Sequence, residues 1–273
     1  MDLITPIAFV IAVAAVIFAD VLDGGAIRSL INIPAMVLVL GGTMGATVMS
    51  VANVDLKKVP GFLMKVLRPK SIKVDATIDD IAALAEVARR EGLLRLEDEL
   101  SRRQVAPFLT RGVQLIVDGA DEDRIRFLMD QELSIFEQRE ASGAIFFETA
   151  GGFAPTLGII GTVVGLVSVL SNLADIQKLA PSIATAFIAT LWGVSSANLF
   201  WLPISNKIKN TLRIEVQARE MIIEGCIAIA AGQNPRLIAE QLAAYRDDSK
   251  KSKKAEAQQP EDEESPELKA VGN

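Results

Sequence analysis

Residues 149–174 have the sequence TAGGFAPTLGIIGTVVGLVSVLSNLA and contain no charged side chain over 26 consecutive positions. Three further stretches are uncharged: 17 residues follow Asp2, 26 follow Arg28 and 28 follow Lys178. A helix needs about 20 mostly apolar residues to cross the hydrocarbon core of a bilayer. The sequence therefore predicts an all-α integral membrane protein with four transmembrane helices. The helices are expected near residues 3–20, 31–52, 150–172 and 181–204.

Composition excludes several classes of function. The 273 residues include no histidine and a single cysteine, Cys226, so histidine-based catalysis, an internal disulfide and a zinc site of the usual kind are not expected. A net charge of −6 argues against nucleic-acid binding. No nucleophile motif or phosphate-binding loop is present. We expect neither an enzyme nor a bound cofactor.

The basic residues predict the orientation in the membrane. They are concentrated after the second and the fourth predicted helix, and the short connectors hold only Arg28 and Lys178. The concentrated residues are Lys57, Lys58, Lys65, Arg68, Lys70 and Lys73, followed later by Lys207, Lys209 and Arg213. Basic loops normally face the cytoplasm. Both termini and residues 53–149 are therefore expected on the cytoplasmic side.

The chain divides into five predicted parts. They are transmembrane helices in 1–52, a helical cytoplasmic domain in 53–149, a second transmembrane pair in 150–204, C-terminal cytoplasmic helices in 205–245, and a disordered charged tail in 246–273. Thr77 and Asp80 have the spacing of a capping box, which predicts a helix that starts there and ends at Gly92. The helix after Asp121 is expected to continue into the third span.

Small and hydroxyl residues recur at helical spacing in the last two predicted spans. In one they are Pro155, Gly158, Thr162 and Gly165, and in the other Ala186, Thr190, Gly193 and Ala197, with Pro203 below. Such stripes are most often helix-packing surfaces. Two such stripes on adjacent helices, each with one hydroxyl, also suit an ion pathway. Because the three longer spans contain no lysine, carboxylate or histidine at membrane depth, a partner would have to supply the ionisable group.

Several motifs resemble the MotA/PomA family of flagellar motor stator proteins, with neighbouring residues most similar to its MotC-like branch. In the membrane the motifs are 152–166 (GFAPTLGIIGTVVGL), 188–193 (IATLWG) and 202–204 (LPI). Outside it they are 88–98 (ARREGLLRLED), 112–119 (GVQLIVDG) and 232–236 (GQNPR). The resemblance covers residues 1–245 and implies a stator A subunit in the bacterial inner membrane.

The resemblance implies partners and an ion. Five such chains would form a homo-pentamer around a dimer of a single-span MotB/PomB-like subunit, which carries the membrane aspartate. Pro155, Pro203 and Thr190 match functional positions of the family, and Thr162 matches a threonine of many sodium-driven members. Gly152 stands where sodium-driven members have an aspartate, and Ala189 replaces a threonine, so protons are favoured over sodium as the translocated ion.

Four charged residues match the family's rotor contacts. Arg89, Arg90, Glu97 and Asp98 align with cytoplasmic charges that similar proteins use to contact the rotor protein FliG. Without the resemblance they would be interpreted as a solvated helix face.

Two alternatives stay open at this point. One is an ExbB/TolQ-like energy-transducing proton channel subunit, and the other is a membrane scaffold that conducts no ion. Of the two tryptophans, Trp201 fits an interfacial anchor, whereas Trp192 is expected to pack against neighbouring helices.

Overall fold

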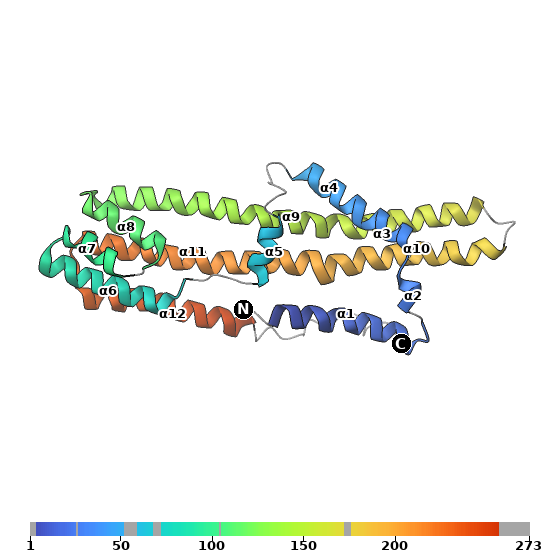
Figure 1. The fold of residues 1–273 in the computed structure, drawn as a ribbon, viewed down its shortest axis with the longest axis horizontal. Coiled ribbons are helices and arrows are strands. Elements are labelled where there is room, and N and C mark those ends of the chain that lie inside the picture. The colour runs from blue at the N-terminus through green and yellow to red at the C-terminus, as the bar shows by residue number, and fades with distance from the viewer. Residues whose placement is uncertain are drawn as a thin grey trace, which may run out of the picture. The chain divides into compact units, whose positions relative to one another are not determined.

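The computed structural model describes residues 4–25, 27–51, 59–67, 72–103, 105–171 and 176–256. Within these ranges the chain is helical and contains no strand, which confirms the all-α prediction (Figure 1). The first half of the chain forms α1 (Ile4–Leu22), α2 (Ile27–Leu30), α3 (Ile33–Met36), the π-helix η1 (Val37–Gly41), α4 (Gly42–Ser50), α5 (Val59–Leu67), α6 (Val74–Glu91), α7 (Arg95–Arg102) and α8 (Pro107–Val117). The second half forms α9 (Glu122–Ser171), α10 (Ile176–Ser196), the π-helix η3 (Ala197–Trp201), α11 (Leu202–Ala230) and α12 (Pro235–Glu256).

Four helical segments are long and apolar enough to cross a membrane, as predicted. They are Ile4–Leu22, Ile33–Ser50, Glu122–Ser171 and Leu179–Ala230. The third is one continuous helix of 50 residues, of which about 20 suffice to span the bilayer. The predicted boundary between residues 149 and 150 therefore falls inside α9, because the same helix continues across it.

The chain divides into two compact units. The first combines residues 1–71 with 131–216, and the second combines 72–130 with 217–273. Helices α9 and α11 each contribute to both units because they cross these boundaries without interruption. The four basic residues Lys57, Lys58, Arg68 and Lys70, which helped to predict the orientation, lie outside the described residues.

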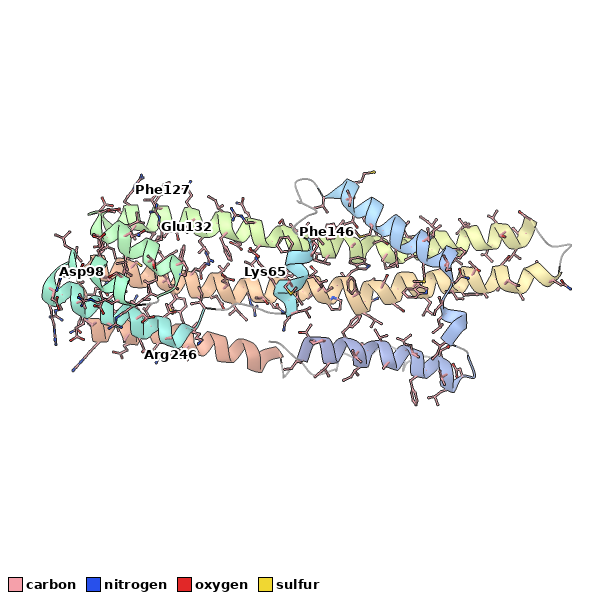
Figure 2. The ribbon with its side chains drawn as sticks, viewed as in Figure 1. Lys65, Asp98, Phe127, Glu132, Phe146 and Arg246 are labelled. Atoms are coloured by element: carbon pink, nitrogen blue, oxygen red, sulfur yellow. The ribbon has the colours of Figure 1, made fainter. Side chains whose placement is uncertain are left out.

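The first unit has an aromatic core where α5 meets α9 and α11. Phe62 of α5 packs against Gly143 of α9, where a methyl group would lie 2.6 Å from the Phe62 ring. Lys65 lies 2.6 Å from Glu140, and Figure 2 labels Lys65 on α5 and the buried Phe146 on α9. Because glycine at 143 leaves room for the ring, α5 lies directly on the backbone of α9.

Trp201 belongs to this core, so the interpretation of its ring as an interfacial anchor is wrong. Its side chain is 8% exposed and its ring centroid lies 4.8 Å from that of Phe200 and 6.2 Å from that of Phe147. The position of Trp201 at the end of a span predicted an anchor. The covering aromatic ring of Phe147 comes from a helix more than 50 positions earlier in the chain, which residue spacing does not reveal.

The second unit consists of α6, α7 and α8 with α12 and the adjoining ends of α9 and α11. Its most buried side chains are aliphatic and include Ile81, Leu84, Leu109, Met129, Ile222 and Leu242. The predicted helix end at Gly92 is confirmed, because this glycine has a φ value of 89°. Gly119 and Gly232 follow the ends of α8 and α11 with φ values of 78° and 66°. Glycine adopts this left-handed conformation without the steric cost that other residues incur.

The predicted start of α6 at Thr77 is wrong. The helix begins at Val74, and Thr77 is a buried residue inside it with 5% of its surface exposed. Asp75 lies in the first turn, where a negative charge is favourable, and its Oδ1 forms an ion pair with Nε of Arg246 in α12, 2.8 Å away. This contact from a distant helix, together with burial of Thr77, stabilises the extra turn.

The predicted start of the tail at residue 246 also needs correction. Helix α12 continues to Glu256, whereas residues 257–273 lie outside the described part of the chain. Lysine, alanine and glutamate dominate residues 250–256, and all three have high helix propensity. The charge of this segment predicts solvation, but charge alone does not prevent a helix from continuing.

Cys226 is expected to be chemically inert in the folded protein. It lies in α11 beyond the predicted fourth span, is fully buried and contacts the backbone at Gly112. Burial raises the pKa of its thiol to about 12, so roughly one thiol in ten thousand is ionised at pH 8. We expect a maleimide to label Cys226 only after denaturation. Rapid labelling of the native protein, at a rate near that of a Ser101→Cys control on the exposed surface of α7, would contradict this burial.

Candidate functional site

Two glycines bring the backbones of α9 and α10 into direct contact. A methyl group on Gly158 would lie 3.2 Å from the Cα of Gly193, and one on Gly193 would lie 2.7 Å from the carbonyl oxygen of Ala154. A side chain at Gly193 would overlap the backbone of α9, and one at Gly158 would fit only if its neighbours moved by a few tenths of an ångström. The structure therefore brings together the two predicted small-residue stripes, and we call the surface between them the glycine seam.

Alanines continue the glycine seam toward the C-terminal end of α9 and the N-terminal end of α10. A methyl group on Gly165 would lie 2.5 Å from Cβ of Ala186, and one on Gly161 would lie 2.5 Å from Cβ of Ala189. Small side chains of this kind let transmembrane helices approach closely enough for van der Waals packing along their length. The seam therefore extends over at least two turns of each helix.

Thr162 and Thr190 meet at the centre of the glycine seam. Their Oγ1 atoms are in hydrogen-bond contact, and both side chains are half-buried. The Thr162 hydroxyl also lies 3.2 Å from the carbonyl oxygens of Gly158 and Ala186, and the Thr190 hydroxyl lies 3.3 Å from that of Gly158. Two hydroxyls and two carbonyls thus gather their oxygens at one point between the helices.

These oxygens are all uncharged. Among the described residues no group of three or more histidine, cysteine, aspartate or glutamate side chains is placed to hold a metal ion. Hydroxyl and carbonyl oxygens can hold a water molecule or help to coordinate a cation. They carry no charge, and the three longer predicted spans contain no carboxylate, lysine or histidine at membrane depth that could neutralise an ion.

Pro155 and Pro203 interrupt the hydrogen bonding of neighbouring helices. Proline has no N–H, so Pro155 leaves the carbonyl of Gly151 without its helical donor. Gly151 lies against the residue just before Pro203, because a methyl group on Gly151 would lie 2.5 Å from the side chain of Leu202. The two interruptions therefore lie at similar heights on adjacent helices.

The π-helix η3 has a direct cause in Pro203. The proline ring clashes with the carbonyl four residues earlier, and η3 occupies the five residues Ala197–Trp201 just before Leu202 and Pro203. A wider π-turn relieves that clash while keeping the helix continuous. Helix α9 contains Pro155 without an assigned π-turn, so the two prolines distort their helices in different ways.

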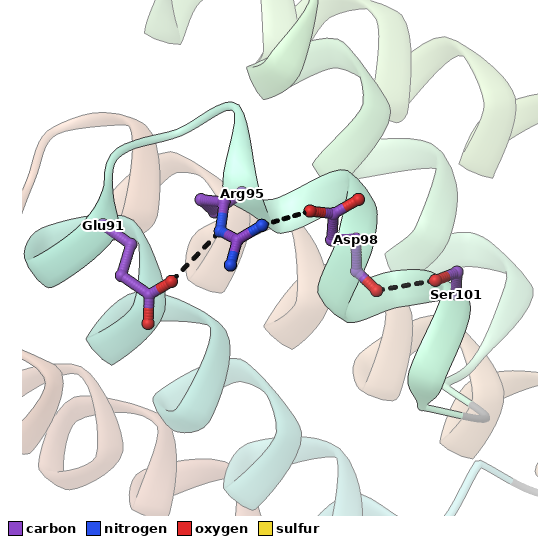
Figure 3. A network of polar contacts seen from close by, with 4 residues as sticks. All are labelled: Glu91, Arg95, Asp98 and Ser101. Carbon is purple, nitrogen blue, oxygen red and sulfur yellow. Dashed lines mark hydrogen bonds and ion pairs between the residues drawn. The ribbon is translucent and has the colours of Figure 1, made fainter.

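The four predicted rotor-contact residues lie at the turn between α6 and α7, and all are exposed. Arg90 forms a 2.7 Å ion pair with Glu86, and Asp98 forms a 2.6 Å ion pair with Arg95. Figure 3 shows Arg95 between Glu91 and Asp98, and the hydrogen bond to Glu91 is the main cause that raises the pKa of Arg95.

Arg89 and Glu97 differ from their neighbours. Neither forms an ion pair with another residue in the part of the chain that the structure describes. Exposed ion pairs contribute only about 0–1 kcal/mol, so the pairs of Arg90 and Asp98 can exchange partners easily. Of the four residues, Arg89 and Glu97 are the two that can contact a partner without first breaking an internal ion pair.

Asn32 and Thr185 are not among the residues predicted from the sequence. The Asn32 side chain accepts a hydrogen bond from the backbone N–H of Ala35 and donates one, 2.9 Å long, to Oγ1 of Thr185. Asn32 is followed two positions later by Pro34, a pattern typical of a helix start, and this signal was available in the sequence. The bond to α10 had no sequence signal.

A family model and several known proteins match this chain. The model of the MotA/TolQ/ExbB proton channel family matches residues 101–221. Motility protein A of Bacillus subtilis is 35% identical over 268 residues, which cover 97% of this chain and 99% of that protein. Chemotaxis protein PomA of Vibrio alginolyticus is 32% identical over 253 residues, covering 92% and 98%.

Solved structures agree with the sequence relatives. The structure of C. jejuni MotAB matches with a TM-score of 0.84 and 28% identity, over 90% of this chain and 96% of that chain. The flagellar MotAB stator complex from Bacillus subtilis matches with a TM-score of 0.81 and 34% identity, over 88% and 94%.

A methyl group at Gly193 should disrupt the glycine seam. We expect Gly193→Ala to destabilise the chain by about 1–3 kcal/mol, because the added Cβ would meet a backbone oxygen that cannot move aside. The melting temperature of the detergent-solubilised protein would report this loss. Gly152→Ala is the matched control, since a methyl group there meets nothing within 4 Å. Equal melting temperatures for the two variants would contradict the proposed close contact.

Proposed function

Because this chain belongs to the MotA/TolQ/ExbB proton channel family, and within it is a flagellar stator A subunit that forms an ion channel with MotB, we propose how its own residues carry the ion and transmit the work. The match to motility protein A over nearly the whole chain favours this role over an ExbB/TolQ-like subunit or a non-conducting scaffold. The family is one of ion-channel subunits rather than known enzymes.

The ion path follows the glycine seam. The observation that carries this proposal is the contact between the Thr162 and Thr190 hydroxyls, which places four neutral oxygens at membrane depth on two helices. The partner contributes the carboxylate that these oxygens lack. An ion neutralises that carboxylate, and the threonine hydroxyls exchange hydrogen bonds with it as the ion passes.

The translocated ion is the proton. A sodium ion needs several oxygen ligands, and Ala189, which stands where sodium-driven members have a threonine, supplies none. Ala189 is 1% exposed and packs against Ala35, Val39 and Gly161, so its methyl group adds no oxygen beside the two hydroxyls. Gly152 is exposed and offers no carboxylate near the entrance to the path. Sodium is the alternative, and the experiment below separates the two.

Proline positions convert the change in charge into movement. The carbonyl of Gly151 lacks a helical donor because of Pro155, and η3 already has a wider turn above Pro203. Helix segments on either side of such positions reorient at lower cost than a regular helix does. Five copies of this chain form a ring around two copies of the partner, and the ring turns as ions pass.

The rotor contact is the turn between α6 and α7. Arg89, Arg90, Glu97 and Asp98 pair with opposite charges on FliG in a transient interface. Exposed charges accelerate association and orient partners without making a long-lived complex, which suits a contact that must form and release repeatedly. Both termini and residues 53–149 then lie on the cytoplasmic side of the bacterial inner membrane, in agreement with the basic residues after the second span.

The choice of ion is testable by swimming speed. A host without stators expresses this chain with its cognate partner, and speed is recorded against external sodium at fixed pH and then with a protonophore. We expect speed to be independent of sodium and to fall to zero with the protonophore. A speed that rises with sodium would overturn the proton proposal and make Thr162 a sodium ligand. A partner that lacks the membrane aspartate provides the inactive control.

The rotor contact is testable by charge reversal. We expect Arg89→Glu and Glu97→Lys each to lower swimming speed severalfold, because both charges are available to a partner without an internal ion pair. Arg90→Glu combined with Glu97→Lys should abolish rotation while membrane levels stay normal. Arg124→Glu and Glu122→Lys are matched controls, because both residues are exposed at the start of α9. Wild-type torque in all of the α6–α7 variants would exclude this surface.

A further inference from the structure

The rear of α10 is held by the segment that leads into the second span. Thr185, Ala189 and Trp192 follow one another at spacings of four and three residues, so they share one face of the helix. Ala186, Thr190 and Gly193 each lie one position further along and form the face toward α9, which adjoins the first face because Ala189 also contacts Gly161 of α9. The two faces are therefore about 100° apart around α10.

Two long-range hydrogen bonds fix this rear face. Nδ2 of Asn32 donates to Oγ1 of Thr185 at 2.9 Å, and Nε1 of Trp192 donates to the backbone carbonyl of Leu30 at 2.8 Å. On α10 the acceptor Thr185 and the donor Trp192 are seven residues apart, which is two helical turns. Between them Ala189 packs against Ala35 and Val39. Residues 30–32 thus contact α10 both before and after the level of Ala189.

Both partners of the bond between Asn32 and Thr185 are oriented by further hydrogen bonds. Thr185 donates its own hydroxyl proton to the carbonyl of Pro181 at 2.9 Å, so its oxygen is oriented to accept from Asn32. The Asn32 side chain in turn accepts a bond from the Ala35 N–H at 3.1 Å, which fixes it at the start of α3. Both bonds of α10 to residues 30–32 are partly buried, so each is partly shielded from competing solvent.

The glycine seam needs such support. Its contacts involve glycine and alanine, whose small side chains do not interlock and so allow one helix to rotate or slide against the other. The hydroxyl contact between Thr162 and Thr190 tolerates little displacement, since hydrogen bonds weaken steeply with distance and angle. Something other than the seam must therefore fix the rotation and height of α10.

We propose that Asn32 and the Leu30 carbonyl are positioning groups for the ion path, which hold α10 at the rotation and height where the Thr190 hydroxyl meets Thr162. This inference rests on the proposed role of the two threonines. We call the two hydrogen bonds, Asn32 to Thr185 and Trp192 to Leu30, the rear clamp. Loosening the rear clamp displaces Thr190 without removing any group from the path.

A cysteine pair measures the position of Thr190 directly. Thr162→Cys with Thr190→Cys, in the complete complex in membranes, should close a disulfide rapidly under mild oxidation, seen as a loss of maleimide labelling that a reductant reverses. Native Cys226 is buried and does not compete. Adding Thr185→Val and Trp192→Phe, which remove both bonds and keep side-chain volume similar, should slow closure severalfold. An unchanged rate would overturn the proposal.

Function is measured in chains that keep both threonines. With Thr185→Val and Trp192→Phe, the concentration of driving ion that supports half-maximal swimming speed should rise severalfold while membrane levels stay normal. Thr185→Ser alone keeps both bonds and should give the wild-type curve. Thr156→Val is the control, because the exposed Thr156 hydroxyl bonds only to Phe153 of its own helix. A slower disulfide with an unchanged speed curve would also overturn the proposal.

The disulfide assay and the speed measurement separate failure of the rear clamp from failure of the proton proposal. The disulfide assay needs no ion, so a sodium-driven result would refute the proton proposal and leave the rear clamp to be judged separately. If the double variant fails to accumulate, Trp192→Phe alone removes one bond while retaining an aromatic ring. A normal disulfide rate and speed curve in that variant would overturn the proposal, and a change in both would support it.

Discussion

The backbone contact between α9 and α10 at Gly158 and Gly193 is the constraint on which the rest of the structure depends. Without a side chain at either position, the helices approach until Gly193 lies against the carbonyl of Ala154. That approach brings the Thr162 and Thr190 hydroxyls together. It also leaves the seam without interlocking side chains, so the orientation of α10 has to be fixed from its other face. Hydrogen bonds from residues 30–32 meet that need.

The proposed ion path lacks an ionisable group of its own. Its oxygens are neutral, and the absence of charged side chains from the longer spans makes the helices stable in hydrocarbon. In the proposed mechanism the charge that drives movement comes from the MotB partner, so ion transfer depends on assembly of the complex. The three longer predicted spans of this chain contain no carboxylate, lysine or histidine that could change its charge at membrane depth.

The second unit meets different requirements. Its aliphatic core and the contacts between α6 and α12 make a stable support, whereas the charges at the turn between α6 and α7 remain exposed. Arg95 connects Glu91 with Asp98 through exposed ion pairs, which add little to the stability of the turn (Figure 3). Arg89 and Glu97 have no such internal contact in the described chain. A turn that carries available charges of both signs suits the transient rotor contact that we propose.

The sequence by itself determined the number of spans, the helical fold and most helix ends, because hydrophobic length and glycine conformation are local properties. It also placed Thr162, Thr190 and their flanking glycines on helix faces, since helical spacing is fixed by geometry. Only the tertiary structure decided that those faces meet, that Trp201 is buried, that α6 starts before Thr77, and that Asn32 reaches Thr185. Each of these depends on residues distant in the chain, and no local pattern encodes which distant groups approach.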